Sequence, residues 1–408
     1  MRILMACAAF PPFIDGGGPI SAMIVAKLLL DLGHEVTVVN VADEARDEVY
    51  DGVPVRRLSS LNIDWNYRLP RPAWKKLVWH ALENFNPRAF FAMRRQIREL
   101  KPDLVLTDSI ENINVATWAA AKSRGVPVAH IVRSAFLICW KGSMWREGRN
   151  CEGACGSCRA SSFGKKLSSR FVDAVIGETD FILERHFSEG YFPWASRHRI
   201  PGAVAVPPGA MPRPVPPADR PLRVGYIGAL DQIKGLDTLA GAAHRMAGRA
   251  VEFIVAGAGS HAYAKTLPER FPAGNTRFLG WTSPDAFFPQ IDVLVIPTLY
   301  REPFGRVVIE AFAQGVPVIG ARNGGIPETI EPGVNGLLFE PGDEAGLTER
   351  IDQLLAERGR LADLSAGALQ AAFGYAPERV AAAFDKVLTG LVVPKAEPRV
   401  LQAKGSLP

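Results

Sequence analysis

The chain has 408 residues, of which 48% are hydrophobic and 22% charged. This length suits two domains of roughly 200 residues each, and it excludes a small disulfide scaffold. The composition is that of a folded globular protein and excludes global disorder. The 47 Lys and Arg against 42 Asp and Glu give a net charge of +5, which suits anionic substrates or membrane surfaces and does not by itself indicate nucleic acid as a partner.

The N-terminal run MRILMACAAF is a short apolar stretch that ends at Pro11 and Pro12 and precedes a glycine loop. It is shorter than the apolar centre of an export signal and lacks a proper charged lead. No window holds the roughly 18 uninterrupted apolar residues of a membrane span. We therefore predict a first β-strand here, and a cytoplasmic location as the default.

Aliphatic runs typical of strands alternate with amphipathic segments through the first half of the chain. The segment from Pro19 to Leu32 predicts a helix, with proline at its first position and Gly33 as its left-handed cap. The alternation predicts an α/β fold with a parallel sheet covered on both faces. The strand-like runs are RILMA, EVTVVN, DLVLT, PVAHIV and DAVIG.

A proline-rich segment, PPGAMPRPVPPADRP, separates the two halves. Prolines suppress both helix and strand pairing, so this segment is predicted to be the interdomain linker. Strand-like runs then restart with LRVGYIG, VEFIVAGAG, TRFLGW, DVLVIPT, GVPVIGA and NGLLFEP. The predicted organisation is a first domain over 1–206, a linker over 207–221, a second domain over 222–371, a C-terminal helix over 372–392 that packs back on the first domain, and a loose tail over 393–408.

The segment 298–342 carries the most informative side chains. Ligands of parallel sheets bind beyond the carboxyl ends of the strands, so the site is expected in a cleft between the domains. Glu302 and Glu310 stand here with seven residues between them, and a short buried helix is predicted to start near Gly305. Its dipole and free N–H groups suit a diphosphate, and Glu310 can accept two hydrogen bonds from a vicinal diol such as a ribose. The free N–H groups are those of Gly305, Arg306 and Val307.

This arrangement resembles the two-glutamate motif of retaining nucleotide-sugar glycosyltransferases with the GT-B fold, family four, also called glycosyl transferases group 1. The resemblance covers nearly the whole chain through the triple glycine after the first strand, YIGALDQIKGLDTL, EPFGRVVIEAFAQGVPVI and GGIPE. It implies two Rossmann-like parallel-sheet domains that face a cleft. It also implies that Glu302 contacts the donor sugar and that Glu310 holds the ribose.

The resemblance assigns further donor-binding residues. Gly17 and Gly18 border the donor phosphates, where glycine lets the backbone approach closely. Lys234 matches the family's phosphate-binding lysine and neutralises the leaving diphosphate, and Gly228 ends the strand before it. Many relatives carry an arginine five residues before this lysine, where this chain has Ala229, so the phosphate charge is expected to rest on Lys234, the helix amides and Arg306.

Loops of the second half are also assigned. Asn323, Gly324, Gly325 and Glu328 form a tight turn that is expected to shape the wall near the sugar. Gly257 and Gly259 lack the third glycine of a dinucleotide fingerprint and indicate a loop beside the nucleotide.

The acceptor side departs from the family pattern. The stretch PVAHIVRSAFLICW aligns with a family segment that commonly has histidine and aspartate after its strand, where this chain has Arg133 and Ser134. Arg133 is predicted to face the donor or an anionic acceptor. His130 is the only nearby histidine, but its place within the strand is more typical of a core residue, so it carries little weight as a base.

Four of the five cysteines gather in sequence, at Cys139, Cys151, Cys155 and Cys158. Four thiolates at such spacing, with glycines between them, predict a structural zinc site. An iron–sulfur cluster or a disulfide is the alternative, although a reducing cytoplasm disfavours a lasting disulfide. We expect a rigid flap near the acceptor side and remote from the chemistry.

Residues 66–99 hold eight basic side chains against two acidic ones, with aromatic residues interleaved. A basic aromatic helix pair suits the anionic face of a membrane, and a core face beside a solvated face is the alternative. A lipid-linked acceptor would explain such a pair, with the enzyme at the inner face of the membrane. The basic residues are Arg68, Arg71, Lys75, Lys76, Arg88, Arg94, Arg95 and Arg98.

The sequence thus predicts a retaining glycosyltransferase that moves a sugar from a nucleotide-sugar donor to a glycan or lipid-linked acceptor, in cell-surface polysaccharide or glycolipid synthesis. No Asp-x-Asp metal motif is present, so no cofactor is expected to be required for catalysis. No nucleic acid partner is expected. The alternatives are an epimerase or phosphorylase on the same scaffold, a catalytically silent donor-binding subunit, and a nicotinamide dehydrogenase, which the missing fingerprint disfavours.

Overall fold

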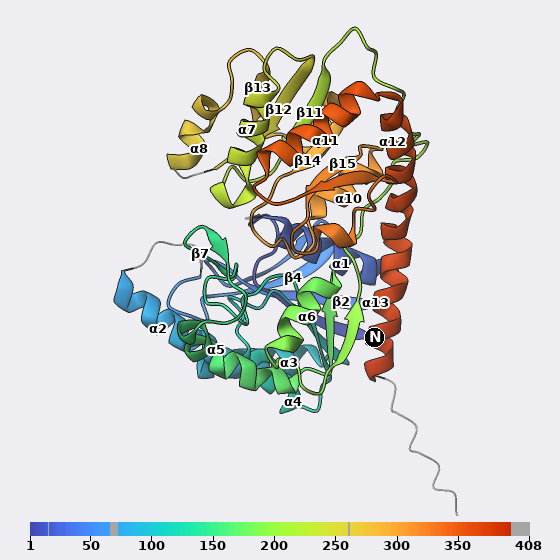
Figure 1. Ribbon diagram of the computed structural model, residues 1–408. Coiled ribbons are helices and arrows are strands. Elements are labelled where there is room, and N and C mark those ends of the chain that lie inside the picture. Colours follow the sequence, from blue (N-terminus) through green and yellow to red (C-terminus); the bar gives the residue numbers. More distant parts are fainter. Residues whose placement is uncertain (15, 66–71, 260–261, 393–408) are drawn as a thin grey trace, which may run out of the picture.

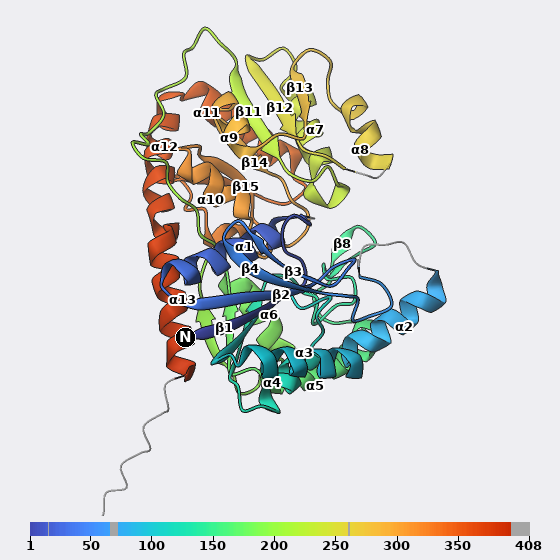
Figure 2. The same ribbon diagram turned by 180° about the vertical axis from the view of Figure 1, so that it is seen from behind.

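The computed structural model describes residues 1–14, 16–65, 72–259 and 262–392. Two α/β domains are stacked on each other, and the last two helices, α12 (Gly359–Ala372) and α13 (Pro377–Val392), follow one another along one side of the pair (Figure 1 and Figure 2). The predicted loose tail over 393–408, and Arg68 and Arg71 of the basic segment, lie outside the described residues. Two Rossmann-like domains that face a cleft are the architecture that the sequence predicts, and this prediction is confirmed.

The first domain is built on an eight-stranded sheet in the order β10-β9-β6-β5-β1-β2-β4-β3. Neighbouring strands are parallel except β3 and β4, which form an antiparallel hairpin at one edge. The strand-like runs of the sequence correspond to β1, β2, β5, β6 and β9, whereas the hairpin and β10 were not predicted. The strands are β1 (Arg2–Cys7), β2 (Glu35–Val41), β3 (Arg46–Tyr50), β4 (Val53–Leu58), β5 (Leu104–Asp108), β6 (Val128–Val132), β9 (Ala174–Gly177) and β10 (Ser196–Arg199).

Helices cover both faces of this sheet because successive side chains of its buried strands point to opposite sides. Ile3 and Met5 of β1 pack with α1, whereas Leu4 and Ala6 pack with α3 and α4. The helices are α1 (Gly17–Asp31), α2 (Ala73–Asn84), α3 (Pro87–Leu100), α4 (Ala116–Lys122), α5 (Gly156–Ser168) and α6 (Asp180–Ser188). A small hairpin of β7 (Trp145–Arg146) and β8 (Arg149–Asn150) lies between β6 and α5.

The second domain has a six-stranded sheet in the order β13-β12-β11-β14-β15-β16, parallel throughout. Its strands are the six that the sequence indicates: β11 (Leu222–Ile227), β12 (Val251–Ala256), β13 (Thr276–Gly280), β14 (Val293–Ile296), β15 (Val318–Ala321) and β16 (Gly336–Phe339). Its helices are α7 (Leu236–Arg245), α8 (Ala262–Thr266), α9 (Pro284–Phe287), α10 (Arg306–Ala313), α11 (Glu344–Ala356) and α12 (Gly359–Ala372). The strand order reverses between β11 and β14, which is where such sheets bind ligands.

The chain passes between the domains twice. Residues 207–221 form no helix or strand, and Arg213 anchors them to the second domain by donating to the carbonyls of Gln314 (2.9 Å) and Ile291 (2.7 Å). Helix α13 (Pro377–Val392) returns and buries Phe384 and Leu388 in the core of the first domain, against α1. None of the helices in the described part of the chain has the length and apolar character that a membrane span requires.

Candidate functional site

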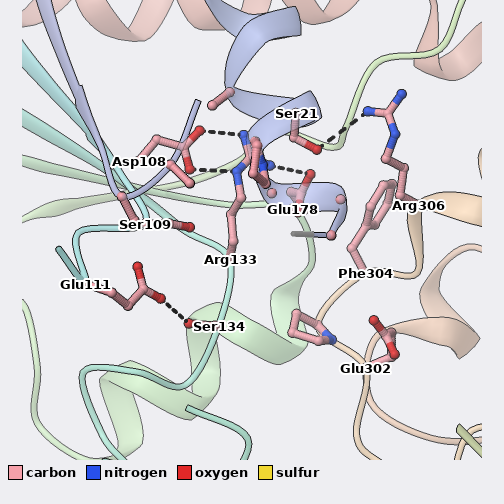
Figure 3. Close-up of a pocket in the computed structure, with 18 of the residues that line it drawn as sticks. Ser21, Asp108, Ser109, Glu111, Arg133, Ser134, Glu178, Glu302, Phe304 and Arg306 are labelled. Carbon is pink, nitrogen blue, oxygen red and sulfur yellow. Dashed lines mark hydrogen bonds and ion pairs between the residues drawn. The ribbon is translucent and has the colours of Figure 1, made fainter. Parts of the chain in front are cut away.

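A cavity of about 280 Å³ lies between the two domains (Figure 3). The first domain lines it with the loops after β1 and β5, the start of α1 and the end of β6, and the second domain lines it with residues 302–306. Because these are the carboxyl ends of strands at the reversal point of the first sheet, the cavity stands where the fold predicts a ligand.

Two helix N-termini meet at this cavity. Helix α10 begins after Gly305, whose φ of 80° places it in the left-handed region. Helix α1 begins at Gly17, two residues before the predicted start, because Gly17 and Gly18 adopt helical geometry and Pro19 fits in the first turn, where N–H groups have no helical partner. A Cβ on Gly17 would lie 3.9 Å from Cδ of Arg306, so the two helix starts are close together. Both line the cavity, and the positive ends of two helix dipoles therefore lie beside the same space.

The two predicted catalytic residues are in direct contact. Lys234 Nζ donates to Glu302 Oε2 at 2.7 Å, and both side chains are about three-quarters buried. Lys234 ends a single 3-10 turn after β11, and Glu302 lies in the loop after β14. The two loops are tied together because the Leu299 and Tyr300 amides both donate to the Ile233 carbonyl, at 3.0 and 3.1 Å.

The glycine turn after β15 supports the backbone of Glu302. The Gly325 amide donates to the Glu302 carbonyl at 2.7 Å, and Asn323 Nδ2 donates to the Leu299 carbonyl at 2.7 Å. A Cβ on Gly324, which has a φ of 60°, would lie only 2.3 Å from the Glu302 carbonyl oxygen. This turn therefore fixes the loop that presents Glu302.

Glu328 has a different role from the one predicted. Its two carboxylate oxygens accept hydrogen bonds from the backbone amides of Asp180 (2.8 Å) and Phe181 (2.7 Å) in the first domain. It thus caps the N-terminus of α6 from the other domain. The expectation that it shapes the wall near the sugar is corrected.

The remaining donor-side residues are distributed around the cavity. Gly17, Gly18, Gly305 and Arg306 line it, whereas Lys234, Gly228, Val307 and Glu310 lie outside its lining as the described residues define it. Glu310 accepts a hydrogen bond from Arg306 Nε at 2.6 Å, and Arg306 Nη1 lies 3.5 Å from Ser21 Oγ of the first domain. The role of Glu310 toward a ribose stays a prediction.

Arg133 lines the cavity, but its guanidinium is engaged by two carboxylates. It donates to both oxygens of Asp108, at 2.6 and 2.8 Å, and to Glu178 at 2.7 Å. Burial opposes the charged form, yet the two carboxylates outweigh burial and raise the pKa of Arg133. The trio joins the ends of β5, β6 and β9, so the arginine braces the sheet edge below the cavity (Figure 3).

His130 is a core residue, and its assignment to the acceptor side is corrected. It is buried, its Nδ1 lies 2.8 Å from Thr107 Oγ1, and its ring packs against Trp118 and Phe192. Burial lowers its pKa to about 3, so the ring is neutral. It lies within β6 below the cavity and does not line it in the described structure.

Glu111, which sequence reasoning missed, lines the cavity from the loop after β5. Its Oε1 accepts from Ser134 Oγ at 3.1 Å, and its buried Oε2 has no hydrogen-bond partner among the described residues. Burial raises the pKa of this carboxyl to about 7. The segment DSIENIN matches no motif, and its place directly after a predicted strand is the only signal that points to it.

The four clustered cysteines are free thiols. Cys139 and Cys158 are buried, Cys151 and Cys155 are partly exposed, and burial with the neighbouring thiols raises the pKa of Cys158 to about 12. No group of three or more His, Cys, Asp or Glu side chains within the described ranges is arranged to hold a metal ion. The predicted zinc site therefore stays a prediction.

The cysteine-rich insertion contacts the loop that carries Glu302, whereas it was expected to be remote from the site. Asn150, at the end of β8, donates to the Leu299 carbonyl at 2.8 Å and accepts from the Arg301 amide at 3.0 Å. Arg301 also pairs with Glu152 at 2.7 Å. The insertion thus binds the loop that carries Glu302 through two hydrogen bonds and one ion pair.

Two family models match this chain, one in each half. A family model described as "Glycosyl transferase 4-like domain" matches residues 16–203, and one described as "Glycosyl transferases group 1" matches residues 221–357. An uncharacterized 42.6 kDa protein in the cps region of Klebsiella pneumoniae is 30% identical over 80% of this chain and 87% of its own length. The lipopolysaccharide core biosynthesis glycosyltransferase LpsE of Rhizobium meliloti is 31% identical over 52% of this chain and 64% of its own length.

Solved structures share the fold at low sequence identity. Sucrose-phosphate synthase from Thermosynechococcus elongatus superposes with a TM-score of 0.74 at 19% identity, over 96% of this chain and 98% of that one. Anabaena HepE in complex with UDP-glucose superposes with a TM-score of 0.71 at 18% identity, over 96% of this chain and all of that one.

Proposed function

We propose a specific reaction for this chain, which belongs to the group 1 family of glycosyltransferases and has the GT-B fold: it transfers a sugar from a nucleoside-diphosphate donor to a hydroxyl group of a glycan or lipid-linked acceptor, with retention of configuration. The observation that carries the proposal is the convergence of the α1 and α10 N-termini beside the Glu302–Lys234 pair. The complex of Anabaena HepE with UDP-glucose supports a nucleotide-sugar donor. The Klebsiella and Rhizobium relatives support a role in cell-surface polysaccharide synthesis.

The chemistry follows from where negative charge develops. The bond between the anomeric carbon and the diphosphate breaks, and its electron pair leaves with the diphosphate. The amides at the starts of α1 and α10 stabilise that charge, and Lys234 neutralises it. Glu302, which Lys234 holds at 2.7 Å, positions the hydroxyls of the donor sugar. The acceptor oxygen bonds to the anomeric carbon on the face that the diphosphate leaves, and the hydroxyl proton passes to a diphosphate oxygen.

The test is product analysis with the full chain. Purified protein is incubated with labelled UDP- and GDP-sugars and a membrane lipid extract of the producing organism, and the anomeric configuration of the product is read by NMR. We expect labelled sugar in the lipid fraction with retained configuration. Rearranged free donor without transfer would contradict the proposal and favour an epimerase.

A matched pair of variants separates an enzyme from a silent donor-binding subunit. Glu302→Gln should lower the rate of transfer by about 10²–10³ while UDP still binds. Glu340→Gln, an exposed glutamate of the same domain that pairs with Arg322, should keep the wild-type rate. Full activity of Glu302→Gln would argue against the proposed role of that carboxylate.

We also propose that the α2 surface binds an anionic bilayer, where a lipid-linked acceptor would be found. Trp74 and Leu77 are largely exposed on α2, beside Lys75 and Lys76. Aromatic and aliphatic side chains next to lysines suit the interface of an anionic membrane.

Vesicle flotation tests this surface. The wild-type protein should float with phosphatidylcholine vesicles that contain phosphatidylglycerol and less with phosphatidylcholine alone. Trp74→Ser with Leu77→Ser should stay in solution, whereas Trp194→Ser, which alters an equally exposed tryptophan elsewhere on the first domain, should float like the wild type. Equal flotation of all three proteins would exclude α2 as the binding surface.

A further inference from the structure

The loop after β5 holds one carboxyl group against the cavity. Ser109 and Asn114 adopt positive φ angles of 48° and 84°, which turn the backbone on either side of Glu111. Asn112 Nδ2 donates to the Ala8 carbonyl at 3.3 Å, and Asn114 Nδ2 donates to the Leu82 carbonyl at 2.8 Å. The loop is therefore tied both to the end of β1 and to α2, and these contacts set the position of Glu111.

One oxygen of this carboxyl lacks a partner. Oε1 accepts from Ser134 Oγ, whereas the buried Oε2 accepts from no donor among the described side chains and backbone. A buried hydrogen-bond acceptor that no hydrogen-bond donor reaches destabilises a fold, and a ligand that supplies the missing donor removes this cost. Figure 3 shows Glu111 and Ser134 on one wall of the pocket and Glu302 on the other.

The charges around Glu111 indicate which kind of group can donate a hydrogen bond to it. The carboxylates of Glu111, Asp108 and Glu178 line this part of the cavity together with Arg133, whose guanidinium pairs with Asp108 and Glu178. An anionic group would be repelled here, and it would be drawn instead to the helix starts at Gly17 and Gly305. A carboxylate only accepts hydrogen bonds, so its natural partner is a hydroxyl group.

We propose that Glu111 accepts a hydrogen bond from a hydroxyl group of the acceptor sugar, and that this contact selects neutral, polyhydroxylated acceptors over anionic ones. The inference rests on the proposed function and adds to it the chemistry of the acceptor. Diphosphate and acceptor hydroxyl then occupy different walls of one cavity, with the donor sugar at Glu302 between them.

The proposal implies a pH dependence. Burial raises the pKa of Glu111 to about 7, and the charges of Asp108 and Glu83 add to this, whereas its own backbone amide and the Ser134 hydroxyl work in the opposite direction. The buried ammonium of Lys165 on α5 also interacts with this carboxyl. Because the ionised carboxylate is the stronger acceptor, acceptor binding should strengthen as the pH rises through about 7.

The experiment measures donor and acceptor binding separately. The acceptor probes are methyl α-glucoside, methyl α-galactoside and methyl α-mannoside, with the labelled UDP-sugar that the wild type turns over. In Glu111→Gln, KM for the best methyl glycoside should rise about tenfold, and its decrease with rising pH should disappear. Kd for UDP, measured by calorimetry, should change less than twofold. Glu189→Gln, a partly exposed glutamate outside the cavity whose Oε1 also accepts one bond, should behave as the wild type.

Three results would overturn the assignment of Glu111. They are an unchanged KM for the glycoside, a parallel loss of UDP affinity, and a pH profile that Glu111→Gln leaves intact. Ser134→Ala, which leaves Oε2 in place, should raise KM less than Glu111→Gln, so a larger effect would also count against the role of Oε2. Failure of the wild type to bind UDP or GDP and to turn over any nucleotide-sugar would instead overturn the proposed function and, with it, the inference.

Discussion

The two walls of the cavity are built in different ways. On the second-domain wall, which the proposed function assigns to the donor and which we call the donor wall, one continuous segment provides Glu302, Gly305 and Arg306, and a helix start there presents backbone amides. On the first-domain wall, which the proposed function assigns to the acceptor and which we call the acceptor wall, the polar groups come from the ends of separate strands, and Arg133 pairs with both Asp108 and Glu178. The donor wall therefore derives its chemistry from local backbone geometry, whereas the acceptor wall derives it from tertiary pairing.

The largest expected effect is on the donor wall. Lys234→Met removes the ammonium that pairs with Glu302 at 2.7 Å, so the leaving diphosphate loses its cationic partner. We expect kcat to fall by about 10²–10³. Single-turnover kinetics with the labelled UDP-sugar measures the chemical step, and Lys265→Met on α8 is the control. If only KM for the UDP-sugar changed, Lys234 would contribute to binding of the substrate and not to stabilisation of the leaving diphosphate.

A backbone change behind Glu302 should have the next largest effect. Gly324→Ala adds a Cβ only 2.3 Å from the Glu302 carbonyl oxygen, at a position where the backbone φ is 60°. The loop must shift, and misplacement of a reacting group by about 1 Å can cost a rate factor of about 10².

Gly333→Ala is the matched control for this change. Gly333 has a φ of 84°, so alanine meets similar backbone strain, but the nearest atom to its Cβ is the end of the Arg360 side chain at 3.9 Å. It should lose stability by about 1–2 kcal/mol and keep its rate per folded molecule. Equal rates for the two variants would show that the glycine turn does not position Glu302.

Loss of the contact between the cysteine-rich insertion and the Glu302 loop should have a smaller effect. Asn150→Ala removes two hydrogen bonds to the loop that carries Glu302, at Leu299 and Arg301. Loss of about 1–1.5 kcal/mol of positioning energy corresponds to a roughly tenfold lower kcat/KM. Asn275→Ala, which removes a bond to the Ala243 carbonyl far from the cleft, should leave kcat/KM unchanged. An unaffected kcat/KM in Asn150→Ala would mean that the insertion contacts the loop without positioning it.

The sequence predicted what local patterns determine. The strand-like runs, the proline-rich linker and the helix start at Gly305 follow from periodicity, proline chemistry and glycine geometry over a few residues. The β3–β4 hairpin was missed, although Asp51 and Gly52, with φ of 48° and 81°, are the two turn residues that such hairpins favour.

The partners of charged side chains could not be predicted in the same way. Arg133 was expected to bind an anion, but β5 and β9 bring Asp108 and Glu178 to it from 25 and 45 residues away. Glu328 was expected at the sugar, but the stacking of the domains places it at the N-terminus of α6. No periodicity encodes such contacts, so the acceptor wall required the structure.

The smallest expected effect separates a core histidine from a catalytic one. Folding lowers the pKa of His130 from 6.5 to about 3, mainly through burial. Between these values the unfolded chain binds a proton that the folded chain does not, so stability is lost as the pH falls below 6.5, by at most about 1.4 kcal/mol per pH unit. His130→Gln should remove the loss of folding stability below pH 6.5 that His130 causes, as measured by urea unfolding. This holds even if the substitution lowers stability equally at every pH. Its rate per folded molecule should keep the wild-type pH profile, because His130 packs against Trp118 and Phe192 below the cavity. A changed pH–rate profile would indicate instead that His130 takes part in the reaction.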